Sequence, residues 1–258
     1  MSDLCCLAAI DLELRQSTFY LAAMIDIHSS PLELQKAITA LRRGEGRSAE
    51  FLLLKKDVKI FQNNRLENTY QDLLESKGMH KACRFFLDQL YCTHDVSLRD
   101  HQVERVLPKL EKLLPGGAVD TVRKVIYMDY LAELMDDEIS SLINAEEWFS
   151  DKSLQEKMYI DAFKRQAQFA VREKQVFLVQ EVGESLRKLV KLPFLGALMR
   201  MTRGAAQKAG LEDFHNFLSI GLEAFSALDK PTLFFQIIQE REMSILSGIR
   251  QGTLSKFP

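Results

Sequence analysis

The sequence predicts an all-α fold, an irregular bundle of about eight or nine helices, and three observations predict it. Leucine occurs 38 times among the 258 residues, against 26 for valine and isoleucine together, and leucine favours helices whereas β-branched residues favour strands. The 12 glycines and 6 prolines are fewer than is usual for a chain of this length. Apolar residues recur at spacings of three and four along most of the chain. Because each apolar face must be buried against another helix, these elements should form a bundle.

The first predicted helix lies between two groups of residues that favour helix ends. Ser29 and Ser30 can cap its first turn, Pro31 suits the first helical position, and Glu33 is an early acid. The pattern continues to about residue 43, where glycines interrupt it. We therefore expect a short helix here.

The charged, glycine-broken stretch at 42–47 is the best candidate for a linker in the chain. We expect residues 1–47 to form an N-terminal appendage, which contains a leucine- and alanine-rich segment at 4–27 that could be helical or hold a short β-segment. Residues 48–258 should form the helical bundle domain.

From Ser48 the spacing of apolar residues predicts a helix up to Leu74, with a slip near Asn63. The run Phe51–Leu54 could instead be a short β-segment. A second apolar stripe, between residues 80 and 91, is also helical in its spacing.

Ser97 and Asp100 resemble a capping box at the start of the next helix. Pro108 should kink this helix, and the sequence Pro115–Gly117 should end it. A further helix is predicted from about residue 118 to 143.

From residue 153 to 192 the chain is compatible with helix throughout. Because nearly forty residues exceed the usual length of a globular helix, we expect a break around 171–174, or else one long rod. Three more helices should follow, at about 194–208, 211–228 and 231–249.

Composition excludes several classes of protein. A chain with 47% hydrophobic residues and a net charge of -2 can bury a full core, and it lacks the general basic character of proteins that bind nucleic acid. No apolar run approaches the roughly 20 residues needed to cross a bilayer. The four cysteines have no zinc-ligand spacing, and the acidic first residues do not fit a secretory signal. We expect a cytoplasmic protein with no nucleic-acid partner and no membrane span.

One series of motifs carries a resemblance to a known family. The motifs, in order, are Arg84–Leu87, Leu90–Tyr91, Asp95, Arg99–Asp100, Arg105–Val106, Pro108 and Leu114–Pro115. This order resembles a family of uncharacterised bacterial proteins, and the likeness continues over roughly residues 60 to 245. Cys92–Thr93 stands where that family usually has glycine and proline. The resemblance implies a helical domain of unknown function and brings no activity, cofactor or partner.

Two groups of charged residues are candidates for a site. Arginine–carboxylate pairs in the motif segment could bind an anionic group at a helix junction, although we favour a structural role for them. Four acids from Asp129 to Asp137 share one helical face and could bind a hard cation, although we favour pairing with basic residues of a neighbouring helix. The candidate polar cluster comprises Arg84, Asp95, Arg99, Asp100, Arg105, Asp129, Glu133, Asp136 and Glu181.

Glu212 and His215 form a single E-x-x-H, the spacing found in di-iron bundles. Such a centre needs a second copy, which the chain lacks, so these two residues are weak metal candidates and we expect no cofactor. Cys83 and Cys92 lie near histidines only in sequence, which does not establish a thiol catalyst.

Lys188, Lys191, Arg200, Arg203 and Lys208 form a local basic surface. No exposed aromatic residues alternate with them and no helix-turn-helix pattern surrounds them, so we favour a solvated face over a nucleic-acid groove.

Two functions remain open. The rich apolar helix faces favour a non-enzymatic module that binds a protein partner or associates with itself. The alternative is a helical-bundle enzyme or ligand binder with an interior arginine–carboxylate site, with or without a metal ion. Its test is where Arg84, Arg99, Asp129 and Glu133 point: if they meet in a pocket, the alternative becomes the better hypothesis.

Overall fold

The computed structural model describes residues 25–113, 116–192 and 194–258, and within these ranges all regular elements are helices. The predicted all-α class is therefore confirmed. The described residues form twelve α-helices, more than the eight or nine expected, because short breaks divide several apolar stretches. In chain order the helices are α2 (Pro31–Arg43), α3 (Ala49–Thr69), α4 (Gln71–Glu75), α5 (His80–Phe85), the π-helical η1 (Phe86–Leu90), α6 (Ser97–Leu113), α7 (Gly116–Leu142), α8 (Ala145–Ser150), the 3-10 turn η2 (Lys152–Leu154), α9 (Gln155–Gln166), α10 (Phe169–Leu189), α11 (Leu195–Lys208), α12 (Glu212–Ser226) and α13 (Pro231–Gln251).

The helix predicted after Ser30 is present as α2. Ser30 and Glu33 form a capping box, and Gly44 closes the helix in the left-handed conformation with a φ of 65°. Leu34 and Ile38 are fully buried in a core shared with α6 and α7. Residues 1–24 of the predicted appendage, including most of the segment at 4–27, lie outside the described residues.

Two expectations for the segment after Ser48 are wrong. The run Phe51–Leu54 lies inside α3 and is not a strand. The helix passes Asn63 without a slip and breaks at Tyr70, whose φ of -113° and ψ of 22° are not helical. At this break the Tyr70 hydroxyl makes a tertiary contact, since it donates to Glu242 of α13 at 2.8 Å.

The segment from residue 153 to 192 breaks at Ala167 rather than at 171–174. Ala167 has a φ of 55°, a left-handed conformation that is uncommon for a residue with a side chain. The turn lets the Gln166 side chain donate to the Met135 carbonyl oxygen at 3.2 Å and to Glu138 at 2.8 Å. The break therefore occurs where the chain makes hydrogen bonds to α7, and local helix propensity contains no information on such contacts.

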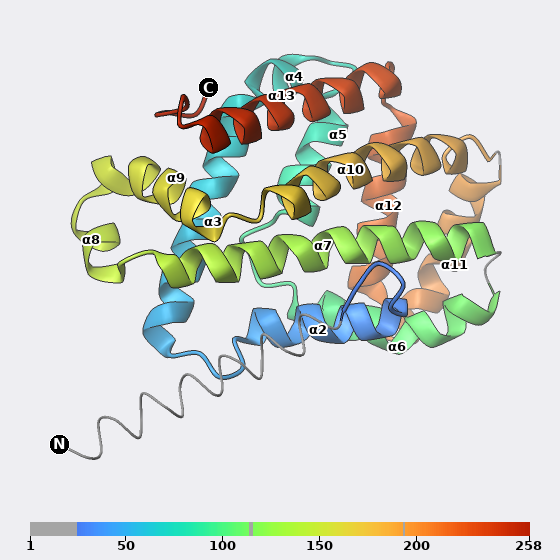
Figure 1. Cartoon of the computed structure of the whole chain (residues 1–258). Helices are drawn as coiled ribbons and strands as arrows, with labels where there is room; N and C mark the ends of the chain where they lie inside the picture. Colours follow the sequence, from blue (N-terminus) through green and yellow to red (C-terminus); the bar gives the residue numbers. More distant parts are fainter. Residues whose placement is uncertain (1–24, 114–115, 193) are drawn as a thin grey trace.

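Helix α7 runs through the middle of the molecule (Figure 1), with α2, α3, α9 and α10 packed against it. Helices α10 and α13 pack closely, since a Cβ added to Gly183 would lie 2.4 Å from the ring of Phe235. In contrast, α11 lies at the edge of the bundle, contacts α12 and contains no buried residue. No helix in the described ranges is long and apolar enough to cross a membrane.

Candidate functional site

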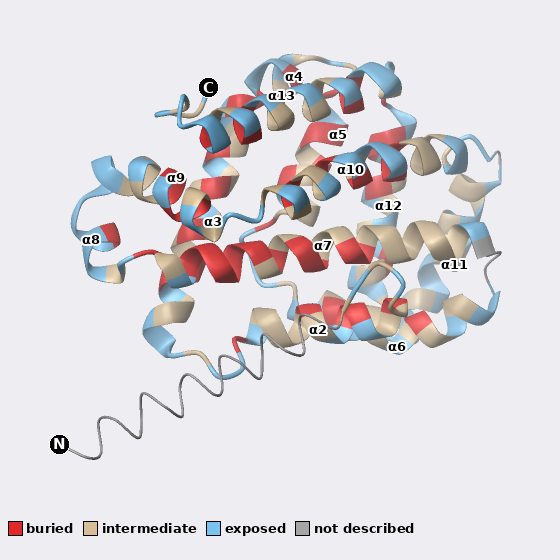
Figure 2. Cartoon of the chain, viewed as in Figure 1, coloured by how far each residue is buried: buried red, intermediate tan, exposed pale blue. Residues whose placement is uncertain are grey.

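The middle of α7 buries acidic side chains. Glu133, Asp136 and Asp137 are at most 5% exposed, although carboxylates are rarely buried in proteins. Asp129 lies one turn before Glu133 on the same face. Figure 2 shows this stretch of α7 as buried. A carboxylate in such a place needs hydrogen bonds and counter-charges, and two neighbouring groups of side chains surround these acids.

Arg42, at the C-terminal end of α2, is the centre of the first group. Its guanidinium group binds Asp100 of α6 at 2.7 Å, Asp129 at 2.6 Å and Glu133 at 2.9 Å. Burial opposes the charge of Arg42, but the three carboxylates outweigh this effect and raise its pKa. One arginine therefore connects α2, α6 and α7.

Helix α3 adds two lysines to this group. Lys59 donates to Glu133, and Lys55 lies 3.6 Å from Glu133 and 3.4 Å from Asp137. Burial alone would raise the pKa of Glu133, but the charges of Lys59, Arg42 and Lys55 lower it to about 2. Glu133 is thus an ionised carboxylate held between three cations.

Two further arginines complete the group. Arg47 binds Asp137, and Arg99 lies 3.6 Å from Asp100 while donating to the Gln89 carbonyl oxygen at 2.7 Å. Multiple charged contacts of this kind fix the helices in place but leave little room for a ligand. We call this group the charge network; it comprises Arg42, Arg47, Lys55, Lys59, Arg99, Asp100, Asp129, Glu133 and Asp137.

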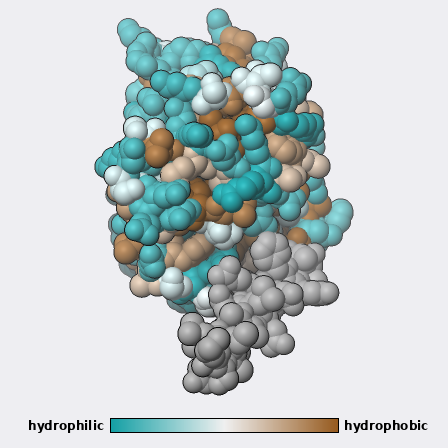
Figure 3. Space-filling view, turned by 60° about the vertical axis from the view of Figure 1, so that its left-hand side comes forward, coloured by the Kyte–Doolittle hydropathy of each residue, from teal (hydrophilic) through white to brown (hydrophobic). Residues whose placement is uncertain are grey.

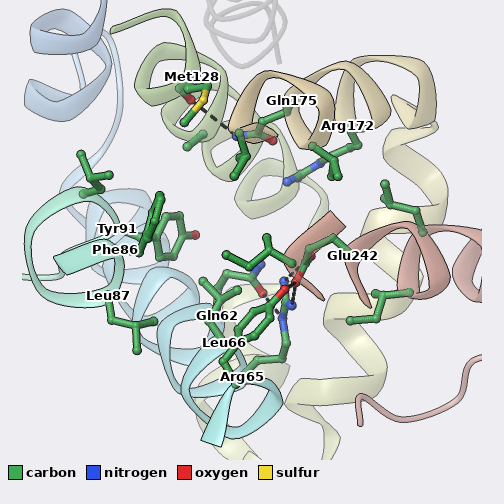
Figure 4. A pocket seen from close by; sticks show the side chains of 18 of the residues that line it. Gln62, Arg65, Leu66, Phe86, Leu87, Tyr91, Met128, Arg172, Gln175 and Glu242 are labelled. Carbon is green, nitrogen blue, oxygen red and sulfur yellow. Dashed lines mark hydrogen bonds and ion pairs between the residues drawn. The ribbon is translucent and has the colours of Figure 1, made fainter. Parts of the chain in front are cut away.

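A cavity of about 230 Å³ lies beside the charge network. Side chains from α3, α4, α5, η1, α7, α9, α10 and α13 line it, and most of the lining is apolar. Figure 4 shows Leu66, Phe86 and Leu87 around it. Asp129 belongs both to the charge network and to the cavity wall.

One polar group of the cavity wall is internally satisfied. Arg65 binds Glu242 at 2.7 Å, and the hydroxyl of Tyr70 donates to the same carboxylate at 2.8 Å. Burial opposes the charge of Arg65, but Glu242 outweighs it and raises the pKa of Arg65. This group connects α3 to α13 and has no strong need of a ligand.

The second polar group, which we call the polar end, comprises Tyr91, Asp136, Tyr159 and Arg172. The Tyr91 hydroxyl donates to Asp136 at 2.7 Å. Burial raises the pKa of Asp136, with a partial offset from Lys59, and raises the pKa of Tyr159 to about 12. Tyr159 is therefore a neutral hydroxyl at physiological pH.

Two atoms of the polar end lack a partner. The Tyr159 hydroxyl and the Arg172 Nε are buried and have no hydrogen-bond partner among the described residues. Arg172 donates from Nη2 to the Gln166 side chain at 3.2 Å and lies over the ring of Phe163 at 4.7 Å. No carboxylate in the described ranges lies within ion-pair distance of it. Figure 4 shows the nitrogen atoms of Arg172 directed into the cavity and the Tyr91 hydroxyl facing them from the other side.

The structure brings five of the nine predicted cluster residues together. Arg99, Asp100, Asp129 and Glu133 belong to the charge network and Asp136 to the polar end. Asp100 does not form the expected capping box with Ser97, because it binds Arg42. The Ser97 backbone N–H instead donates to the side chain of Asp95 at 2.9 Å.

The other four predicted residues lie elsewhere, outside the charge network and the polar end. They are Arg84, which binds Glu67 at 2.5 Å; Asp95, which is exposed; Arg105, which donates to the Ala209 carbonyl oxygen at 3.1 Å; and Glu181, which binds Lys124 at 2.9 Å.

The weak metal candidates are separated by their partners. His215 contacts the Met199 carbonyl oxygen at 2.9 Å, and Glu212 accepts from Gln207 at 3.1 Å. Within the described ranges, no group of three or more potential ligands is arranged to hold a metal ion. Cys83 lines the cavity, and burial raises its pKa to about 11, so its thiol is not an activated nucleophile.

Five residues of the two groups were not predicted from the sequence: Arg42, Lys55, Lys59, Tyr159 and Arg172. Arg42 lies in the stretch interpreted as a linker. The two lysines are one turn apart on α3 and flank the buried Val58, so a basic pair within an apolar face was a usable signal. Arg172 similarly precedes Val176 by one turn on the buried face of α10.

Comparison with known proteins gives one match. A family model described as Domain of unknown function (DUF8198) matches residues 42–256, which is most of the chain. No curated protein matches the sequence, and no solved structure matches it. The matched range begins at Arg42, the residue that joins α2 to the charge network.

Proposed function

We propose that this chain, which belongs to the family of the domain of unknown function DUF8198, binds a small carboxylic acid with an apolar body in the cavity beside α7. The observation that carries the proposal is the buried Arg172, which faces this cavity without a carboxylate partner among the described residues. Of the four residues whose meeting in a pocket would have favoured the interior site expected from the sequence, only Asp129 lines the cavity, so the site proposed here is a different one, built around Arg172.

The size of the cavity supports a small ligand. An apolar cavity of roughly 150 Å³ accommodates a benzene molecule. A cavity of about 230 Å³ would by the same ratio hold about nine non-hydrogen atoms. Hexanoate, octanoate and phenylacetate are of this size.

The chemistry of the polar end supports a carboxylate. Arginine presents donors in a planar fork that matches a carboxylate, and such charged hydrogen bonds are stronger than neutral ones. The neutral Tyr159 hydroxyl can donate a further hydrogen bond to the same group. Asp136 in the same region accepts a hydrogen bond from the Tyr91 hydroxyl, and burial raises its pKa.

Binding is favoured over catalysis because the polar end has no activated nucleophile. The tyrosine hydroxyls have raised pKa values, and the thiol of Cys83 is equally unreactive. The partner-binding hypothesis remains a separate prediction, for which the cavity gives no support.

The experiment is a ligand titration of the full chain, followed by calorimetry and thermal unfolding. Octanoate is the probe and 1-octanol the neutral analogue of the same length. A ligand at about 100 times its Kd stabilises a protein by about 2.7 kcal/mol, so binding should be visible as a raised Tm. We expect octanoate to bind more tightly than 1-octanol.

Arg172→Met should weaken octanoate binding at least about tenfold, since a charged hydrogen bond contributes roughly 1.5–3 kcal/mol, and should leave 1-octanol binding unchanged. Arg84→Met, on the surface, is the matched control and should bind octanoate as the wild type does. The proposal fails if octanoate does not bind, or if Arg172→Met binds octanoate with wild-type affinity.

A further inference from the structure

Helix α11 and the residues before it expose apolar side chains in one group. Five of the fifteen large hydrophobic residues exposed in the described ranges lie between residues 189 and 201. The exposed fraction is 81% for Met201, 59% for Phe194 and 45% for Leu198. Because Phe194 lies between the exposed Lys191 and Arg200, the expectation that no exposed aromatic residue alternates with these basic residues is wrong. By contrast, the face in Figure 3, with the end near α8 and α9 turned forward, is mainly hydrophilic with small separate hydrophobic groups. The cluster at 189–201 is therefore unusual for this molecule.

The exposed apolar residues form a stripe on α11. Phe194, Leu198 and Met201 are spaced by four and three residues, so they share one side of the helix. Met199 and Thr202 lie on a different side and contact His215 of α12. At 3.6 residues per turn, the exposed stripe is centred about 100° from the side that packs on α12. The helix thus has one side that contacts α12 and a separate apolar side that faces solvent.

The same segment carries only positive charge. Residues 185–211 contain six basic residues and no acidic one, in a chain whose overall net charge is -2. Lys191, Arg200 and Lys208 are exposed, and no carboxylate in the described part of the chain forms an ion pair with them. Charge complementarity therefore favours an anionic occupant of this surface over a neutral or basic one.

From these features we infer that α11 is an interfacial helix that binds the surface of an anionic lipid bilayer. A helix with a solvent-facing apolar stripe and a basic polar face lies in the plane of the membrane interface, with the apolar side chains below the headgroups. Long basic side chains extend to the phosphates while their methylene stems remain in the apolar region. An acidic protein groove would also complement the charge, but it would not require aromatic and methionine side chains exposed to this extent.

The test is vesicle flotation of the full chain with phosphatidylcholine vesicles, with and without phosphatidylglycerol. We expect binding to the anionic vesicles, little binding to the neutral ones, and a large loss at about 1 M salt, where the Debye length is about 3 Å. The substitutions Lys191→Gln, Arg200→Gln and Lys208→Gln together should weaken binding on the order of 100-fold, at about fivefold per basic residue. The matched control replaces three exposed lysines elsewhere with glutamine, at Lys56, Lys77 and Lys157, and should retain most of the binding.

A second variant tests insertion. Phe194→Ser, Leu198→Gln and Met201→Gln together should weaken binding to anionic vesicles at least tenfold, and Leu53→Gln, which is 64% exposed on α3, should not. Circular dichroism of each variant checks that it folds. Polyglutamate serves as a probe for an acidic protein partner. The inference is overturned if the wild-type chain does not float with anionic vesicles, whether or not it binds polyglutamate. It is also overturned if the apolar variant binds the vesicles as well as the wild type does. None of these outcomes depends on the cavity ligand.

Discussion

The charge network and the polar end of the cavity share α7 but differ in how their charges are compensated. In the network, Arg42 binds three carboxylates and Glu133 lies between three cations. In the polar end, Arg172 and Tyr159 have buried donors with no partner among the described residues. A group whose charges are paired stabilises one arrangement of helices, even though the Glu133 Oε2 atom accepts no hydrogen bond among the described residues, whereas a group with unpaired donors has them available for a ligand. The comparison suggests that residue type alone does not identify a site.

The largest expected effect on stability comes from removing the central carboxylate of the charge network. Glu133→Gln leaves Arg42, Lys55 and Lys59 with one carboxylate fewer, so we expect the free energy of unfolding to fall by about 3–5 kcal/mol. Denaturant titration measures this change. Glu181→Gln is the control, since the Glu181 side chain is 54% exposed and its ion pair should contribute less than about 1 kcal/mol. Equal effects of the two substitutions would show that the network does not stabilise the fold.

The pH dependence of stability should come from the same residue. The pKa of Glu133 is about 2 in the folded protein, below its ordinary value of 4.5. An acid whose pKa is lower in the folded protein than in the unfolded chain stabilises the folded state at pH values above its unfolded pKa. This stabilisation is lost as the pH falls through the folded pKa. Between about pH 4.5 and 2 the wild type should therefore lose about 3 kcal/mol that Glu133→Gln has already lost. If the free energy of unfolding falls equally for the wild type and Glu133→Gln between about pH 4.5 and 2, Glu133 is not the source of the pH dependence.

The opposite response is expected at the polar end. Arg172→Met removes a buried charge that forms no ion pair among the described residues, although Asp136 and Glu138 interact with it at longer range, and the variant keeps an unbranched apolar side chain over Phe163. Because replacing buried charge with apolar groups is often neutral or stabilising, the ligand-free variant should be within about 1 kcal/mol of the wild type, or more stable. Denaturant titration without ligand measures this. A loss as large as that of Glu133→Gln would mean that Arg172 is structural, and the distinction between the two regions would disappear.

The helical class could be predicted from the sequence because the spacing of apolar residues and the amino-acid composition are local properties. The positions of α2 and the shared face of Asp129, Glu133 and Asp136 were also predicted correctly. The breaks at Tyr70 and Ala167 were not predictable in this way, because each accompanies a hydrogen bond to a distant helix.

The site was less predictable than the fold. Spacing brought the acids of α7 to one face, but the counter-charges come from α2 and α3, and only tertiary packing shows which acids they reach. Arg172 is separated by 36 residues from Asp136 in the sequence, so no motif joins them. A charged residue within an apolar helical stripe is the sequence signal that both cases share.

The smallest expected effect concerns two buried thiols. Cys83 lines the cavity and Cys92 does not, while burial raises the pKa of both. Alkylation of either should be slow at neutral pH, because the thiolate is the reactive form, and should accelerate as the pH rises. If octanoate occupies the cavity, it should slow the modification of Cys83 a few-fold and leave Cys92 unchanged, as measured by peptide mapping with mass spectrometry. Equal protection of both thiols would indicate general stabilisation, and protection of neither would place the ligand outside the cavity.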